Sequence, residues 1–324
     1  MNFSTPVTDF GQTFTIKPQY NILALGSCFA NVIGKKMQDN RFKILLNPFG
    51  TLYNPKSIFS ILYLSIDILE KKLDIDNLPQ DIIFEREKND WRSWFASSYI
   101  YGETREQCKK SLYNALQKMV SYIKKLDVLM LTFGTNHYYY LKENKTGSNL
   151  CVANCHKMPS SFFGEAEMPL TDILKEFGDI IDRLRQIRPQ IKVITTVSPY
   201  RYIKYGLHQS QISKASILLS IDIAMKQYKN LYYFPAYEIV NDELRDYRFY
   251  SKDMVHPSEV TEEYIWEKFC QYYLSKDSLS FINEWNTILK MQAHIPTSEE
   301  KNLLLQENIN QRIEKIKEKY PLMF

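Results

Sequence analysis

The sequence predicts an α/β fold in which a mostly parallel sheet is layered with helices. Short apolar runs that stop at Gly, Ser or Pro alternate with amphipathic stretches of helical length. Buried parallel strands have this uninterrupted apolar character, and helices are the usual connections between them. A hydrophobic content of 44% and a charged content of 24% are typical of an ordinary globular chain with a sizeable core.

The apolar runs are the expected strands. Each is about four to eight residues long, the usual length of a buried strand. They are YNILAL at 20–25, LDVLMLTF at 126–133, IKVITTVSP at 191–199 and NLYYFP at 230–235.

The expected helices lie between and after these strands. A capping-box pair, Thr104 and Gln107, opens a helix that reaches about Lys125. The segment 169–189 has apolar residues at helical spacing, and Pro189 closes it. Segments 213–228 and 261–274 have the same helical pattern.

The chain loses its strand pattern after residue 275. A second capping box, Thr297 to Glu300, precedes a charged helix with a narrow apolar stripe. We therefore expect an α/β domain over residues 1–275 and a helical extension over 276–324. The stripe fits either docking on the same chain or pairing with a partner, such as a second copy in a homo-oligomer. Its residues are Leu303, Leu304, Ile309, Ile313 and Ile316.

Charge and cysteine usage exclude several classes of function. The net charge of +4 comes from 41 basic and 37 acidic residues that are interspersed, which does not favour nucleic-acid binding. No segment reaches the roughly 18 apolar residues of a membrane span. The odd number of scattered cysteines suits reduced thiols and predicts a cytoplasmic protein. Cys151, Cys155 and His156 lack a fourth ligand at zinc spacing, so no metal and no other cofactor is expected.

Polar and nucleophilic side chains gather in segments that follow strands or lie in loops. These segments are ALGSCFA at 24–30, LTFGTNH at 131–137 and KDMVHPSEV at 252–260. Ligands of open α/β sheets bind outside the carboxyl ends of the strands, so we expect the segments to share one site.

The residue types in these segments predict acyl transfer. A neutral nucleophile needs a base, and His256 suits that role because imidazole titrates near neutrality. Asp253, three residues earlier, is placed to orient the imidazole. The side-chain amide of Asn136 and the backbone amide of Gly50, in the turn NPFGTLYNP, are the expected oxyanion donors.

The chain resembles the GSCFA family, which takes its name from the string at 26–30. Further shared segments are NPFGTLYNP, LTFGTNH, NCHKMP, TVSPYR, YYFPAYEI and LRDYRFYSKDMVHPS, and the resemblance fades past residue 276. The family is regarded as an outlying branch of the SGNH/GDSL hydrolase-like superfamily. The resemblance implies a three-layer α/β/α sandwich and a nucleophile after the first strand. It also implies oxyanion donors at Gly50 and Asn136 and a late Asp-x-x-His pair at Asp253 and His256.

The opening motif departs from the superfamily pattern of Gly, Asp and Ser. With the glycines aligned, Ser27 stands where the superfamily has Asp, and Cys28 stands at the nucleophile. Cys28 is therefore the first candidate, because a thiol beside a histidine at a helix N-terminus readily forms a thiolate. The alternative keeps Ser27 as nucleophile and makes Cys28 a small core residue.

The resulting hypothesis is an ester hydrolase or O-acyltransferase that forms a covalent acyl-enzyme. The acyl ester could belong to a small molecule, a carbohydrate or a lipid. His156 is a candidate for substrate binding or a structural loop histidine, and Arg201 either binds an anionic group or is solvated. The alternative function is a ligand-binding module on the same fold without catalysis.

Overall fold

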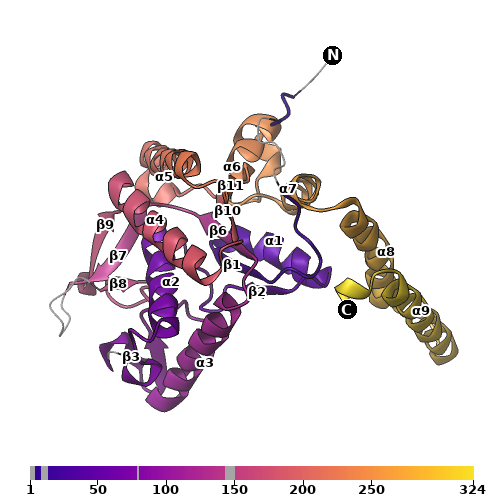
Figure 1. The fold of residues 1–324 in the computed structure, drawn as a ribbon, viewed down its shortest axis with the longest axis horizontal. Coiled ribbons are helices and arrows are strands. Elements are labelled where there is room, and N and C mark those ends of the chain that lie inside the picture. The colour runs from indigo at the N-terminus through magenta and orange to yellow at the C-terminus, as the bar shows by residue number, and fades with distance from the viewer. Residues whose placement is uncertain (1–3, 9–13, 79, 143–149) are drawn as a thin grey trace.

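A computed structural model of the chain, which describes residues 4–8, 14–78, 80–142 and 150–324, has an α/β core and a helical hairpin beside it (Figure 1). The core is built on a five-stranded sheet in the order β11-β10-β6-β1-β2, and every neighbouring pair is parallel. The four predicted strands are all present, and the structure adds β2 at one edge. The bounds are β1 Ile22–Gly26, β2 Ile44–Leu46, β6 Val128–Phe133, β10 Lys192–Val197 and β11 Leu231–Tyr233.

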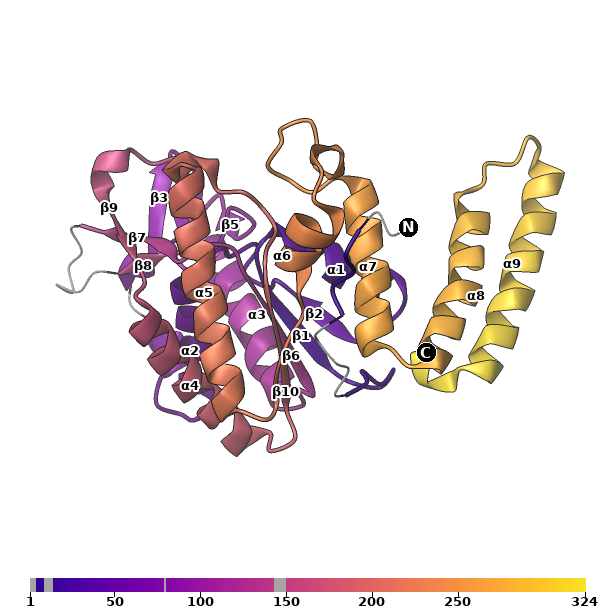
Figure 2. The ribbon, with the colours of Figure 1, turned by 90° about the horizontal axis from the view of Figure 1, so that it is seen from above.

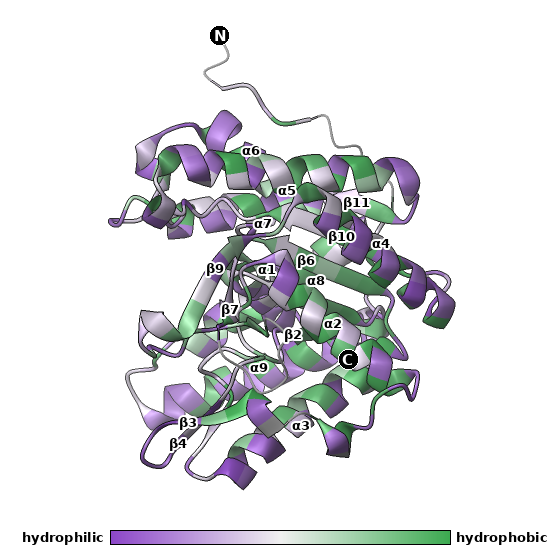
Figure 3. Cartoon of the chain, turned by 90° about the vertical axis from the view of Figure 1, so that its left-hand side faces the viewer, coloured by the Kyte–Doolittle hydropathy of each residue, from purple (hydrophilic) through white to green (hydrophobic). Residues whose placement is uncertain are grey.

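Alternate strand residues pack on opposite faces of this sheet. Leu23 and Leu129 belong to the core on one face, and their neighbours Ile22 and Val128 belong to the core on the other. Hydrophobic colouring runs along β6 in Figure 3, as expected for a strand buried on both faces. The sheet is therefore the middle of three layers.

Helices cover both faces, as Figure 2 shows from above. The first face is covered by α2 Pro55–Leu69, α3 Arg105–Ile123, α4 Leu170–Ile187 and α5 Leu207–Gln227. The second is covered by α1 Cys28–Asp39, the short α6 Ala236–Glu238 and α7 Glu259–Tyr273. The expected three-layer α/β/α sandwich is confirmed.

Local signals fix where these helices begin and end. Thr104 Oγ1 accepts a hydrogen bond from Gln107 N, which is the predicted cap of α3. Pro189 directly follows the last residue of α4 and its C-cap, as expected. Asn54 caps α2 in the same way by accepting from Ser57 N, a helix that the sequence analysis did not predict.

Two small antiparallel sheets flank the core. One has the order β3-β4-β5, and the other has the order β8-β7-β9. The second begins directly after β6, so it extends the loop that holds Asn136. The bounds are β3 Ile83–Glu87, β4 Asp90–Ser93, β5 Tyr101–Gly102, β7 His137–Leu141, β8 Cys151–Val152 and β9 Phe163–Glu167.

The last part of the chain forms a hairpin of α8 Lys276–Ala293 and α9 Glu299–Lys319. The hairpin lies beyond α7 in Figure 2 and docks on the same chain. Trp285 Nε1 donates to the Asp39 carbonyl at 2.8 Å, and the Arg41 guanidinium lies 4.1 Å from the Phe324 ring centroid. The extension is helical, as predicted.

The predicted apolar stripe of α9 is partly wrong. Ile309 and Ile316 are buried, but Leu303 and Leu304 are 63% and 60% exposed. The packed face passes through Leu305 instead. Neighbouring helical residues point about 100° apart, so Leu303 and Leu304 turn away from α8 when Leu305 faces it.

Candidate active site

The candidate site begins at the end of β1, where the chain turns sharply. Gly26 has φ +144°, and a Cβ on it would lie 2.3 Å from the Thr132 carbonyl oxygen of β6. Ser27 N donates to that same oxygen at 3.1 Å, and α1 starts at the next residue, Cys28. Only glycine permits this close approach, which places Ser27 and Cys28 at the carboxyl edge of the sheet.

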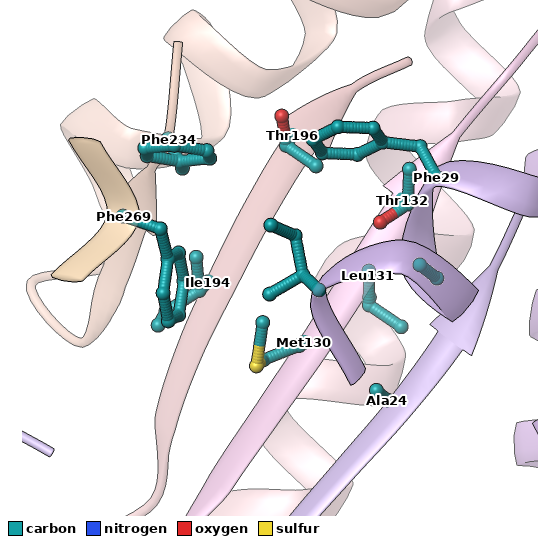
Figure 4. A pocket seen from close by; sticks show the side chains of 11 residues that line it. Ala24, Phe29, Met130, Leu131, Thr132, Ile194, Thr196, Phe234 and Phe269 are labelled. Carbon is teal, nitrogen blue, oxygen red and sulfur yellow. The ribbon is translucent and has the colours of Figure 1, made fainter. Parts of the chain in front are cut away.

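The space directly beneath α1 is core and not a substrate pocket. Figure 4 shows the side chains around a cavity of about 10 Å³, among them Phe29, Met130 and Phe234. This volume is close to that of a single water probe, and the lining is mostly apolar. A ligand must therefore approach Cys28 from outside the sheet edge.

The two candidate nucleophiles differ in access. Ser27 is 1% exposed, and its Oγ has no hydrogen-bond partner among the described residues. Cys28 is partly exposed. Burial raises the pKa of the Cys28 thiol, whereas hydrogen bonds from the Phe29 N–H and its own N–H act to lower that pKa. These N–H groups belong to the first helical turn and have no partner within the helix.

Asp253 and His256 form a pair within one loop. His256 Nδ1 lies 2.5 Å from Asp253 Oδ2, and the backbone N–H groups of Val255 and His256 donate to Asp253 Oδ1 at 3.0 Å each. These N–H groups, with the imidazole, lower the pKa of Asp253 to about 2. Ser258 caps α7 two residues later by accepting from Thr261 N, which fixes the exit of the loop.

Arg201 holds this loop from the segment after β10. Its backbone N–H donates to the Val255 carbonyl at 3.1 Å, and its Nη1 donates to the Met254 carbonyl at 3.0 Å. Its guanidinium also lies 5.5 Å from the ring centroids of both Tyr247 and Tyr250. The geometry thus gives Arg201 a contact that holds the His256 loop, and anion binding by its guanidinium stays a prediction.

Cys28 and His256 share their neighbours. The Tyr200 ring centroid lies 4.5 Å from that of His256. The pKa of Tyr200 is raised by burial and by the charges of Cys28 and Asp253. The Glu262 carboxyl of α7 interacts electrostatically with both Cys28 and His256. The structure therefore brings the thiol and the Asp–His pair to one side of the molecule.

Three tyrosines near the thiol form a cluster of their own. Tyr200 and Tyr202 pack edge to face with centroids 4.7 Å apart, and Tyr53 lies 6.5 Å from Tyr202. Burial raises the pKa of each phenol, and Cys28 is among the further causes for all of them. The Tyr202 hydroxyl is buried without a hydrogen-bond partner among the described residues.

The expected oxyanion donors are already engaged. Asn136 Nδ2 donates to the Met168 carbonyl at 3.3 Å, and the Gly50 N–H donates to the Asn47 carbonyl at 2.8 Å. Gly50 has φ +74° and lies in the wall of an open groove of about 790 Å³ beside α1. The Gly50 N–H would have to leave its partner to serve an oxyanion, whereas Asn136 Nδ2 has a second N–H beyond the one that donates to Met168. The N–H groups of Cys28 and Phe29 donate to the sulfur itself.

His156 lies in a different environment. It is 3% exposed, its Nε2 is 2.9 Å from the Ser93 carbonyl oxygen, and its ring packs edge-on to Phe84 and Trp94. Burial lowers its pKa. These contacts agree with the structural interpretation of this histidine and not with substrate binding.

Sequence reasoning missed Lys214 on α5. The residue is 2% exposed, and its Nζ donates to the carbonyls of Gly134 at 2.6 Å and Ser198 at 2.5 Å. A charged side chain among the small and apolar residues of SKASILLS was the available signal, because buried lysines are rare. Tyr200 and Tyr202 were also missed, although both follow a predicted strand directly.

The chain matches the model of one protein family. The model of the GSCFA family matches residues 21–269. A solved structure, that of a carbohydrate esterase family 3 protein from Talaromyces cellulolyticus, is similar at 8% identity and a TM-score of 0.33, over 82% of this chain and 99% of that one. No curated protein matches.

Two further properties of the described residues bear on partners. No helix there combines the length and apolar character that a membrane crossing requires. No cluster of His, Cys, Asp and Glu side chains there is arranged to hold a metal ion.

Proposed function

The chain belongs to the GSCFA family, and on that basis we propose that it is an acyl-transferring enzyme with Cys28 as its nucleophile. The observation that supports this proposal is the partly exposed thiol at the start of α1, which shares Tyr200 and Glu262 as neighbours with the Asp253–His256 pair. Ser27, with its buried hydroxyl, is the second candidate for the nucleophile.

The proposed reaction starts at the thiol. His256 takes the proton from Sγ, and the thiolate attacks the carbonyl carbon of an ester. The N–H groups of Cys28 and Phe29 donate to the oxyanion. The C–O bond then breaks, and the alkoxide leaves as an alcohol with the proton from the imidazolium. Asp253 keeps the imidazole oriented and stabilises its charged form.

The resulting thioester is resolved by a second nucleophile. His256 removes a proton from water or from an acceptor hydroxyl, which attacks the thioester and releases the thiolate. Water gives an esterase, and a bound hydroxyl gives an O-acyltransferase. Small, carbohydrate and lipid esters all fit this chemistry. We also propose a cytoplasmic location, a catalytic domain over residues 1–275 and a helical extension over 276–324 that can support a homo-oligomer.

A trapped intermediate tests the proposal. The protein is mixed with p-nitrophenyl acetate, quenched in acid, and its mass and peptides are analysed. We expect one acetyl group on Cys28 in the wild type and in Ser27→Ala, none at this position in Cys28→Ala, and slower formation in His256→Ala. Cys155→Ala is the matched control, because Cys155 is also partly exposed, but the charged groups that act on it are Lys204 and Glu165. Acetylation of Ser27 would transfer the role to the serine.

The alternative function is a ligand-binding module without catalysis. The raised pKa of Cys28 favours it, because a thiol that stays protonated at rest is a weak nucleophile. Ligand binding without an adduct or turnover across small, sugar and lipid esters would support this alternative and contradict the enzyme.

A further inference from the structure

Lys214 occupies an unusual place for a lysine. It lies on α5 with its ammonium between the ends of β6 and β10, where it donates to the carbonyls of Gly134 and Ser198. The ring centroids of Tyr202 and Tyr237 lie 5.5 and 5.9 Å from Nζ. In the part of the chain that the structure describes, no carboxylate forms an ion pair with it.

This arrangement leaves the ammonium incompletely satisfied. An ammonium group has three N–H donors, and the carbonyls of Gly134 and Ser198 account for two of them. Burying a charge is costly unless it is paired and fully hydrogen-bonded. The third N–H of the Lys214 ammonium and its positive charge therefore lack a partner among the described residues. An anion at the edge of the sheet would supply one.

Strand pairing places the edge of the sheet near Lys214 next to Cys28. Gly26 of β1 is in register with Thr132 of β6, and the two strands run parallel. Cys28 follows Gly26 by two residues, and Gly134 follows Thr132 by two residues. Strand neighbours are about 4.8 Å apart, so the thiol and the Lys214 ammonium lie at adjacent strand ends.

The electrostatics agree with this placement. Burial lowers the pKa of Lys214 to about 7, and among the described residues the ionisable group that acts to raise it is Cys28. Burial raises the pKa of Cys28 most, two backbone N–H groups lower it, Glu262 raises it, and Lys214 lowers it by a smaller amount. The remaining titratable groups around the thiol are His256 and the phenols of Tyr53, Tyr200 and Tyr202.

We infer that Lys214 is the cation that stabilises the Cys28 thiolate, and that its third N–H donates to the negative charge that forms at this position. When a base removes the proton from Sγ–H, the negative charge on sulfur favours the protonated form of Lys214, and the ammonium balances that charge. The part of this inference that concerns an acyl oxyanion rests on the proposed function, whereas the part that concerns the thiolate does not.

The competing explanation is that Lys214 only ties two strand ends together. A neutral side chain that donates to the same carbonyls would then serve as well. The effect of the positive charge of Lys214 can be separated from the effect of its hydrogen bonds by three substitutions of this residue. Lys214→Met removes both, Lys214→Gln keeps a donor without charge, and Lys214→Arg keeps the charge.

The test measures alkylation of Cys28 by iodoacetamide as a function of pH, with peptide mass spectrometry. We expect Lys214→Met and Lys214→Gln to raise the pH midpoint by about one unit, which is about tenfold slower labelling at neutral pH. Lys214→Arg should keep the midpoint close to that of the wild type. Lys226→Met is the matched control on the same helix, because Lys226 is exposed and pairs with Asp222. Its midpoint should not move.

A midpoint that stays unchanged in folded Lys214→Met, or that moves equally in Lys214→Arg, would overturn the inference. A second measurement avoids substitution of the lysine. In protein with ¹³C-labelled lysine, Lys214 is identified as the side chain that titrates near neutrality, and Cys28→Ala should lower its pKa. An unchanged Lys214 titration in Cys28→Ala would also overturn the inference. Neither measurement uses ester turnover, so a failed esterase assay would reject the proposed function alone.

Discussion

Gly26→Ala should be among the most damaging substitutions of a single methyl group in this chain. The new Cβ would lie 2.3 Å from the Thr132 carbonyl oxygen and 2.8 Å from the Thr132 nitrogen. Both are backbone atoms of β6, which pairs with β1 on one side and β10 on the other. β6 therefore cannot move away from the new methyl group without disturbing its pairing with β10.

The size of the effect follows from two terms. A non-glycine residue in a rarely populated backbone region costs about 1–3 kcal/mol, and Gly26 has φ +144°. Overpacking in a well-filled core costs about 1–3 kcal/mol. Their sum is about 2–6 kcal/mol, a large part of the roughly 5–15 kcal/mol that separates folded from unfolded states.

Gly206→Ala separates the two terms. Gly206 has φ +82°, but among the described residues no heavy atom outside Gly206 and its two chain neighbours lies within 4 Å of the position of its Cβ. Its substitution should therefore cost the backbone term alone, about 1–3 kcal/mol. The assay is urea unfolding of both variants followed by circular dichroism, with Cys28 alkylation as a local probe. Equal destabilisation by the two substitutions would refute the steric reasoning.

The remaining predictions concern the loop, the pair within it and the hairpin. Arg201→Met should slow acetylation of Cys28 about three- to tenfold, since it removes one charge-assisted hydrogen bond to the His256 loop; an unchanged rate in the folded variant would contradict the positioning role. Asp253 has a depressed pKa, so its hydrogen bonds should persist as pH falls and be lost only near about pH 2. The rate of Cys28 alkylation between about pH 4 and about pH 9 should therefore show no step from this carboxyl. Asp253→Asn should slow alkylation throughout that range, and equal rates would show that the pair does not act on the thiol. Trp285→Ala should cost the docked hairpin about 3–5 kcal/mol and open a protease site between α7 and α8, while Cys28 labelling stays unchanged; an unchanged digestion pattern would show that the hairpin is held elsewhere.

The sequence predicted the central strands well because they are buried on both faces. An uninterrupted apolar run such as LDVLMLTF has few alternatives to a parallel strand. The edge strand β2 has only three residues, and the small sheets contain short strands with charged residues, such as Ile83–Glu87. β2 pairs with β1 and β9 pairs with β7 across longer stretches of sequence, so local patterns could not show these partners. β3 and β4 form a local hairpin, but their charged residues hide the apolar pattern of a strand.

The candidate site was predictable where spacing alone decides the geometry. Asp253 and His256 are three residues apart, and one loop suffices to join them. The roles of Gly50 and Asn136 depend on what else their amides contact, which only the folded chain shows. Lys214 stands far from Cys28 in the sequence, and strand order alone brings the two together.

The tripeptide Tyr200–Arg201–Tyr202, which follows β10, contacts both the His256 loop and the Lys214 side chain. Tyr200 packs against the His256 ring, Arg201 donates a hydrogen bond to the backbone of the same loop, and the Tyr202 ring lies near the Lys214 ammonium. Inserting or deleting a single residue there would rotate all of these side chains out of place at once. Variants that probe the candidate site should therefore leave this tripeptide intact and change Tyr53, which is 39% exposed and packs against Tyr202.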